Sequence, residues 1–207
     1  MRIGVDFDNT LANYAGVFHR AAVDQALIPA DLPSDKTSVR DYMRARGRDV
    51  EFTVLQGHVY GARMDLVAPY PGAREALRAL KAAGHDLFIV SHKTREPFAG
   101  PRYDLHAAAF GFLRACGLMG EGALFAPGAV FFEFTKEAKA ARAAVLGCDA
   151  FIDDLPEILA LEGFPAGMRA ILFDPDCHYP GGHWKGRTFE RYHAWAEIGA
   201  ALARENG

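Results

Sequence analysis

Short, almost uninterrupted apolar runs constrain the fold of this chain more than any other feature of its sequence. Five of them are rich in Val, Ile and Phe, at Arg2–Asp6, Asp86–Ser91, Ala129–Phe134, Ala150–Asp153 and Arg169–Asp174. Strands buried on both faces of a parallel sheet have this pattern, because neither face alternates with polar side chains. Segments with helical spacing separate the runs. The sequence therefore predicts an α/β fold, a doubly wound parallel sheet with right-handed crossovers.

One connection in this pattern is far too long. About 55 residues separate the first strand from the helix expected after it, whereas such loops usually have about two to six. We interpret residues 12–66 as an inserted helical cap, which leaves 1–11 and 67–207 as the main domain. The predicted helices of the cap are Val17–Leu27, Ser38–Gly47 and a third within Asp49–Met64. Its aromatic residues should form an apolar centre, with stacking on a ligand as the alternative; they are Tyr14, Phe18, Phe52 and Tyr60.

The composition excludes several classes of function. The 207 residues include 23 Lys and Arg against 26 Asp and Glu, a formal charge of −3, so we expect no nucleic acid polymer as a partner. No stretch without these four residue types exceeds eleven residues, well short of the roughly 20 that a membrane helix needs. Three widely spaced cysteines and an acidic N-terminal segment favour a cytoplasmic location. The sequence leaves the oligomeric state open.

Pairs of carboxylates end two of the predicted strands. Asp6 and Asp8 follow the first strand, and Asp153 and Asp154 end the fourth. Doubly wound sheets bind ligands beyond the C-terminal ends of neighbouring strands, so these four acids should converge. Like charges in one small volume are costly unless a cation or a shared proton relieves them. An all-oxygen cluster suits a hard cation, and we therefore expect Mg²⁺ rather than zinc.

Groups that bind anions follow two other predicted strands. Ser91 ends the second strand with a hydroxyl, and Lys136 begins the helix after the third, where free N–H groups favour negative charge. Lys139 could face the site instead, and Lys136 is preferred because it starts the helix. Together with the acids, these groups indicate a pocket for a phosphoryl group, whose transfer depends chiefly on positioning and neutralising its oxygens.

Four ordered motifs resemble those of the haloacid dehalogenase (HAD) superfamily. They are VDFDNTL at Val5–Leu11, IVSH at Ile89–His92, Lys136, and FIDD at Phe151–Asp154. The resemblance implies a HAD-like Rossmannoid fold. It also implies an Mg²⁺-dependent phosphatase, because an Asp at position 8 is typical of the phosphatases of the superfamily rather than of its dehalogenases.

The resemblance further implies a role for each motif residue. Asp6 would form an aspartyl-phosphate, and Asp8 would protonate the leaving oxygen and later activate water. The phosphoryl group would be held by Ser91 and Lys136, with Asn9, Thr10 and His92 as further candidates for phosphate binding; Thr10 would also support the loop of the first motif. The metal would be held by Asp6, Asp8 through its backbone carbonyl, Asp153 and Asp154. No role is transferred to the side chains of His92 and Lys93.

The expected partner is a small phosphate monoester. Tyr70–Leu77 and the position of the insertion resemble the 5′(3′)-deoxyribonucleotidase-like branch, which favours a nucleoside monophosphate; a sugar phosphate is the alternative. A receiver-like phosphoacceptor domain and a non-catalytic binding protein are rival classes, although receivers place the accepting Asp after a middle strand. The loop with Asp176, Cys177 and His178 has no tetrahedral metal spacing, so we interpret it as solvated rather than as a zinc site.

Overall fold

The computed structural model describes residues 1–165, 167–179, 181 and 183–203, so residues 204–207 of the expected main domain lie outside it. The chain forms two compact units. The core unit contains Met1–Ala12, Pro69–Lys93 and Cys116–Gly207, and the helical unit contains Asn13–Ala68 and Thr94–Ala115. The insertion expected at 12–66 makes up most of the helical unit. Residues 94–115, which we assigned to the main domain, belong to the helical unit instead.

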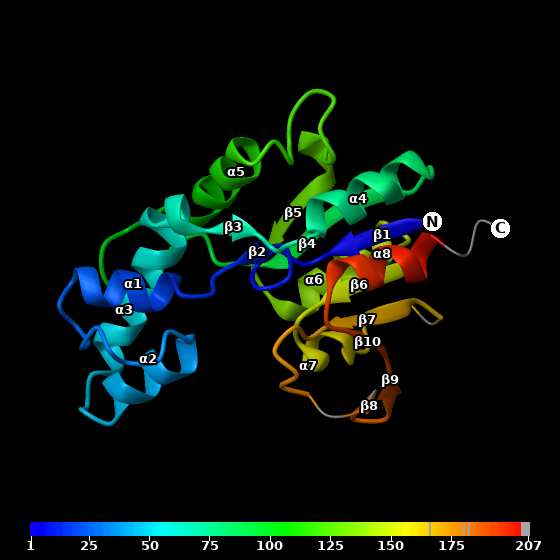
Figure 1. Cartoon of the computed structure of the whole chain (residues 1–207). Helices are drawn as coiled ribbons and strands as arrows, with labels where there is room; N and C mark the ends of the chain where they lie inside the picture. Colours follow the sequence, from blue (N-terminus) through cyan, green and yellow to red (C-terminus); the bar gives the residue numbers. More distant parts are fainter. Residues whose placement is uncertain (166, 180, 182, 204–207) are drawn as a thin grey trace. The chain divides into compact units, whose positions relative to one another are not determined.

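The core unit is built on a six-stranded parallel sheet with the strand order β10-β7-β6-β1-β4-β5 (Figure 1). The strands are β1 (Arg2–Val5), β4 (Asp86–His92), β5 (Val130–Glu133), β6 (Ala150–Asp153), β7 (Arg169–Phe173) and β10 (Glu190–Tyr192). In the centre, Val5 of β1 lies opposite both Ile89 of β4 and Ile152 of β6. The predicted α/β fold with a parallel sheet is confirmed, and β10 is an additional strand that the apolar pattern does not reveal.

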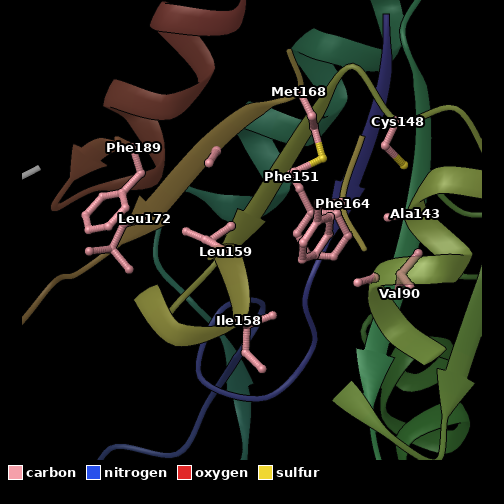
Figure 2. Packing of buried hydrophobic residues seen from close by; sticks show 12 residues of the cluster. Val90, Ala143, Cys148, Phe151, Ile158, Leu159, Phe164, Met168, Leu172 and Phe189 are labelled. Carbon is pink, nitrogen blue, oxygen red and sulfur yellow. The ribbon is translucent and has the colours of Figure 1, made fainter. Parts of the chain in front are cut away.

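Helices cover both faces of this sheet. They are α4 (Ala73–Ala82), α6 (Lys136–Val145), α7 (Pro156–Leu159) and α8 (Trp195–Ala203). On one face, α6 and α7 pack in a buried cluster that includes Leu159 together with Phe151 and Leu172 of the sheet (Figure 2). Phe173 is adjacent to Leu172 and points to the opposite face, where its ring lies 5.9 Å from that of Trp195. Helix α8 therefore lies on that second face, packed against α4.

The helical unit has an apolar centre of its own. Its helices are α1 (Val17–Asp24), α2 (Lys36–Arg44), α3 (Asp49–Ala62), the 3₁₀ helix η1 (Met64–Leu66) and α5 (Leu105–Ala115). Phe18, Phe52 and Tyr14 are buried, and the ring centroid of Tyr60 lies 5.0 Å from that of Tyr14 and 5.6 Å from that of Phe18. These rings form the apolar centre that the sequence predicts.

Two glycines of α3 explain why residues 94–115 join the helical unit. A Cβ atom at Gly57 would lie 2.6 Å from Cβ of Pro97, and one at Gly61 would lie 2.4 Å from Cβ of Tyr103. The missing side chains let the segment before α5 approach the backbone of α3 closely. Helix α5 therefore packs along α3. The alternation of strands and helices in the sequence had indicated that this helix would pack on the sheet.

The remaining elements are short. β2 (Ala12–Asn13) pairs with β3 (Ala68–Pro69), β8 (His183–Trp184) pairs antiparallel with β9 (Arg187–Thr188), and the 3₁₀ helix η2 (Pro127–Ala129) precedes β5. Among the described residues, no helix has the length and apolar character needed to cross a membrane.

Candidate active site

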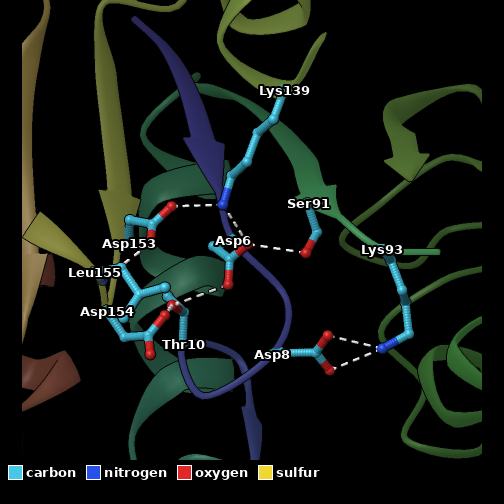
Figure 3. A network of polar contacts seen from close by, with 9 residues as sticks. All are labelled: Asp6, Asp8, Thr10, Ser91, Lys93, Lys139, Asp153, Asp154 and Leu155. Atoms are coloured by element: carbon cyan, nitrogen blue, oxygen red, sulfur yellow. Dashed lines mark hydrogen bonds and ion pairs between the residues drawn. The ribbon is translucent and has the colours of Figure 1, made fainter. Parts of the chain in front are cut away.

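The C-terminal ends of β1, β4 and β6 meet at one edge of the sheet, as their parallel register requires. The pairing continues past β1, because the Asp6 N–H donates to the carbonyl of Ile152 at 2.9 Å. Asp6 therefore lies between Ser91 at the end of β4 and Asp153 at the end of β6, and all three residues are buried (Figure 3). The structure thus brings together Asp6, Asp153 and the hydroxyl of Ser91, which the sequence places at separate strand ends.

A tight turn follows Asp6 and fixes the next residues. The N–H groups of Leu11 and Ala12 donate to the carbonyl of Phe7 at 3.1 and 2.8 Å. Asn9 has a left-handed φ of 57°, which Asn tolerates better than most residues do. The turn reverses the chain within a few residues. These hydrogen bonds hold the backbone at Asp8 and Asn9 in one conformation just beyond the C-terminal end of β1.

Thr10 connects this turn to the acids. Its buried hydroxyl lies 3.4 Å from a carboxylate oxygen of Asp6 and 3.4 Å from one of Asp154. On the other side, the indole N–H of Trp195 donates to the Thr10 carbonyl at 3.0 Å. Thr10 thus supports the loop of the first motif, and helix α8 supports Thr10.

Lys139 lies among the acids. Its side chain is 3% exposed, and Nζ lies 2.5 Å from Oδ1 of Asp6 and 2.5 Å from Oδ2 of Asp153. The same Asp6 oxygen accepts a hydrogen bond from Oγ of Ser91 at 2.8 Å. The second oxygen of Asp153 accepts from the Leu155 N–H at 3.0 Å. One buried ammonium therefore bridges the ends of β1 and β6.

The preference for Lys136 over Lys139 is wrong. The Lys136 side chain is 44% exposed, and its ammonium lies 4.0 Å from Glu157 rather than among the acids. Thr135 is the N-cap of α6, and its hydroxyl accepts from the Ala138 N–H at 3.0 Å. Because Lys139 lies one turn into α6, it shares the buried face of the helix with Ala140 and Ala143. The lysine that enters the site is therefore the one on the buried face of α6, not the one at the start of the helix.

The acids carry more negative charge than Lys139 neutralises. Burial raises the pKa of Asp153 to about 7, Lys139 opposes this shift, and Asp6 adds to it. Burial, followed by Asp153 and Asp6, also raises the pKa of Asp154 well above its ordinary value. Burial disfavours the charged form of Lys139, but the adjacent Asp153 and Asp6 still raise its pKa above the ordinary range. The cluster therefore favours a bound proton or an additional cation.

Three of the acids have the geometry of a cation site. One carboxylate oxygen each from Asp6, Asp153 and Asp154 lies within 4.8 Å of the others. Such an all-oxygen donor set with unneutralised charge fits a hard divalent cation such as Mg²⁺. Of the four residues expected to hold the metal, Asp6, Asp153 and Asp154 therefore have an arrangement that fits a divalent cation.

Asp8 lies apart from this cluster and contacts a lysine to which the sequence assigns no role. The Lys93 ammonium lies 2.9 and 2.7 Å from the two carboxylate oxygens of Asp8 (Figure 3). The sequence separation of the residues could have indicated this contact. Asp6 pairs with Ser91 and Asp8 with Lys93, each 85 residues further on, so both contacts join the segment that follows β1 to the C-terminal end of β4 and the residue after it.

His92 and the loop that contains Cys177 and His178 are not part of the acid cluster. His92 follows Ser91, and its Nε2 lies 3.1 Å from the carbonyl of Phe134, so the ring is positioned against the chain after β5. In the loop after β7, Cys177 and His178 are exposed, and Asp174 accepts from the His178 N–H at 2.8 Å. Among the described residues, the only group of His, Cys, Asp or Glu arranged to hold a metal is Asp6, Asp153 and Asp154.

Comparison with solved structures identifies HAD-superfamily hydrolases as structural neighbours. A HAD family hydrolase from Deinococcus radiodurans, solved with bound phosphate and sodium, has a TM-score of 0.59 at 19% identity, over 99% of this chain and 96% of that chain. A structure described as a dehalogenase has a TM-score of 0.62 at 15% identity, over 98% and 96%. A predicted phosphoglycolate phosphatase from Haemophilus somnus has a TM-score of 0.53 at 18% identity, over 95% of both chains.

These similarities establish the fold. No protein-family model matches the chain, and no curated protein matches it either. These neighbours include a predicted phosphoglycolate phosphatase and a structure described as a dehalogenase, and at these identities the similarity shows the fold alone.

Proposed function

We propose that this chain is an Mg²⁺-dependent phosphomonoester hydrolase that acts through an aspartyl-phosphate at Asp6. The environment of Asp6 is the observation that carries the proposal. This buried carboxylate accepts hydrogen bonds from Ser91 and Lys139 at 2.8 and 2.5 Å and lies next to Asp153 and Asp154. A nucleophile fixed among donors that can hold developing negative charge is what phosphoryl transfer requires.

The proposed reaction has two steps. An Asp6 oxygen attacks phosphorus, the bond between phosphorus and the ester oxygen breaks, and a proton from Asp8 goes to that oxygen. Water then attacks the aspartyl-phosphate, its proton goes to Asp8, and inorganic phosphate leaves. Ser91 and Lys139 would hold the phosphoryl oxygens in both steps, and Asp6 and Asp8 return to their starting states.

Asp6, Asp153 and Asp154 would hold the Mg²⁺, together with the backbone carbonyl of Asp8. When bound, the ion would neutralise the acids and the negative oxygens of the phosphoryl group. Lys139 and Thr10 keep the side chains of these acids in place from the protein side.

Asp8 favours a phosphatase over a dehalogenase. A phosphate ester releases an alkoxide that needs a proton, so a carboxyl group beside the nucleophile has a function there. Release of a halide needs no proton donor, so a dehalogenase would have no use for Asp8 as an acid. The chemistry at this position therefore supports hydrolysis of a phosphate ester.

The substrate class follows from the resemblance in sequence. We propose a nucleoside monophosphate first and a sugar phosphate second, and the phosphatase among the structural neighbours adds phosphoglycolate to the compounds that need testing. A 5′-nucleotidase activity would show as selective hydrolysis of nucleoside 5′-monophosphates.

The experiment measures phosphate release from a panel of nucleotides, sugar phosphates, phosphoglycolate and 4-nitrophenyl phosphate, with Mg²⁺ and with EDTA. We expect turnover that requires Mg²⁺. Asp6→Asn should abolish it without loss of folding, because an amide cannot form the aspartyl-phosphate, whereas the exposed Asp176→Asn control should retain it. Turnover of 4-nitrophenyl phosphate by Asp6→Asn at a rate close to that of the unchanged protein would refute the proposal.

A further inference from the structure

A second buried lysine lies beside the candidate active site. The Lys93 side chain is 3% exposed and contacts both carboxylate oxygens of Asp8, whose side chain is 21% exposed. A buried ammonium is costly unless hydrogen bonds and an opposite charge compensate it. The pair is therefore a specific arrangement in the core unit, since both residues lie within that unit.

The backbone on each side of this pair is fixed. The Lys93 N–H donates to the carbonyl of Glu133 at 2.8 Å, which extends the pairing of β4 with β5 one residue beyond His92. Asp8 lies in the tight turn that begins at Phe7. Two rigid backbone segments thus present the ammonium and the carboxylate to each other, and no loop rearrangement is needed to form the contact.

The ring of Phe7 contributes to the position of Lys93. The Lys93 ammonium lies 5.3 Å from the centroid of this fully buried ring, and the ring itself packs edge-on against Phe132 of β5. An ammonium over an aromatic ring is attracted to the negative face of the ring, more strongly when it is shielded from water. The residue between Asp6 and Asp8 therefore helps to hold the lysine that contacts Asp8.

We propose that Lys93 is a positioning residue for Asp8, an inference that rests on the proposed phosphatase function. By bonding both oxygens, the ammonium directs the Asp8 carboxyl group away from Asp6, as Figure 3 shows. Asp6 then remains available to attack phosphorus, and Asp8 remains available to protonate the leaving oxygen. When that oxygen takes one side of the carboxyl group, Lys93 still holds the other, and the direction of proton transfer is fixed.

The test separates positioning of a proton donor from a general effect on the site. A 4-nitrophenolate leaving group needs little protonation, whereas an alkoxide needs a proton from Asp8. We expect Lys93→Met to lower kcat/KM for an alkyl phosphate about 100-fold or more, and to lower kcat/KM for 4-nitrophenyl phosphate less than about 10-fold. kcat/KM is used because it reports the step in which the ester oxygen leaves. Lys81→Met, at an exposed lysine of α4, is the control and should change neither value.

A double-mutant cycle tests whether Lys93 acts through Asp8. In an Asp8→Asn background, Lys93→Met should lower kcat/KM for the alkyl phosphate by less than about 3-fold, because its target is already removed. Lys93→Arg keeps the charge and two donors and should recover part of the activity. Equal losses on both substrates, or additive losses in the cycle, would overturn the inference.

The remaining outcomes are also decisive. If circular dichroism shows that Lys93→Met does not fold, Lys93→Gln replaces it, since it removes the charge that faces Asp8 but keeps a polar side chain in this position; an unchanged ratio of the two kcat/KM values in that variant overturns the inference. Phosphate release by the unchanged protein is measured first. If the unchanged protein hydrolyses neither ester with Mg²⁺ present, the proposed function itself has failed, which is distinct from failure of the role of Lys93.

Discussion

At the residue scale, the two lysines of α6 provide a matched pair. Both lie in the first turn of the helix. Lys139 is buried between Asp6 and Asp153, whereas the side chain of Lys136 is 44% exposed beside Glu157. An exposed ion pair at 4.0 Å contributes little, whereas a buried ammonium between two acids cannot be removed without leaving their charge uncompensated. The two positions therefore differ in burial and in ion-pair partners although they share a helix.

We expect Lys139→Met to lower kcat/KM about 100-fold or more, the usual effect of removing one charged group that stabilises a transition state. Lys136→Met should leave kcat/KM within about 2-fold, since it touches no site residue. Both are measured with 4-nitrophenyl phosphate after circular dichroism has shown that the variants are folded. Equal losses in the two variants would mean that charge on α6, rather than the contact with Asp6, matters.

The choice between these lysines shows where sequence interpretation fails at this scale. Asp6, Ser91 and Asp153 could be placed because each lies at, or directly after, the end of a strand. A lysine on a helix is different, because its direction depends on which face of the helix is buried. The Ala-rich sequence of α6 offers apolar residues on several faces, so only packing against Phe151 and its neighbours selects Lys139.

At the element scale, β10 has no apolar run because it is an edge strand held by polar contacts. Arg169 of β7 and Glu190 of β10 are joined by two hydrogen bonds of 2.7 and 2.8 Å, and the Tyr192 hydroxyl donates to Glu190 at 2.8 Å. An edge strand faces water and needs no apolar alternation of the kind that marks a central strand. The search for apolar runs therefore finds the four inner strands and the apolar edge strand β5, and it misses the polar edge strand β10.

Asp174 joins this edge strand to the loop after β7. The buried carboxylate accepts hydrogen bonds from the N–H groups of His178 and Tyr179 at 2.8 and 3.0 Å, and from Nε of Arg191 at 2.8 Å. Burial alone would raise the pKa of Asp174, but these three donors lower it overall. Its stabilising effect should therefore be present above the ordinary pKa of the carboxyl group, and should be lost as the pH falls through the lowered value.

We expect Asp174→Asn to lower the free energy of unfolding by about 1–3 kcal/mol, because the amide cannot satisfy three donors at once. Asp176→Asn changes an exposed acid of the same loop and should stay within about 0.5 kcal/mol of the unchanged protein. Urea unfolding at neutral pH measures both values. A loss in Asp176→Asn as large as that in Asp174→Asn would mean that loop charge, rather than these hydrogen bonds, stabilises the edge.

At the scale of the whole molecule, the sequence predicts the sheet but not the full division of the chain. The central strands follow from their apolar runs, and a connection of about 55 residues requires an inserted unit because loops of that length are rare. The assignment of 94–115 to the helical unit could not be predicted. It depends on close approach at Gly57 and Gly61, and a glycine in a helix does not reveal which segment packs against it.

The acid cluster couples the stability of the whole chain to pH. The ordinary pKa of Asp153 is 3.8, and burial raises it to about 7 in the folded state. Between these values the folded chain binds more protons than the unfolded chain does, so stability should fall as the pH rises through this window. A divalent cation held at the proposed site would reverse the penalty, because it would replace the proton among Asp6, Asp153 and Asp154.

We therefore expect Mg²⁺ to raise the Tm more at about pH 8 than at about pH 5, since at the lower pH protons compete for the same oxygens. Thermal unfolding followed by circular dichroism, with EDTA and with saturating Mg²⁺, measures the difference. In EDTA, Asp153→Asn should flatten the fall of Tm with pH, because its amide does not titrate, and Asp176→Asn should not. An equal Mg²⁺ effect at both pH values would place the ion elsewhere on the chain.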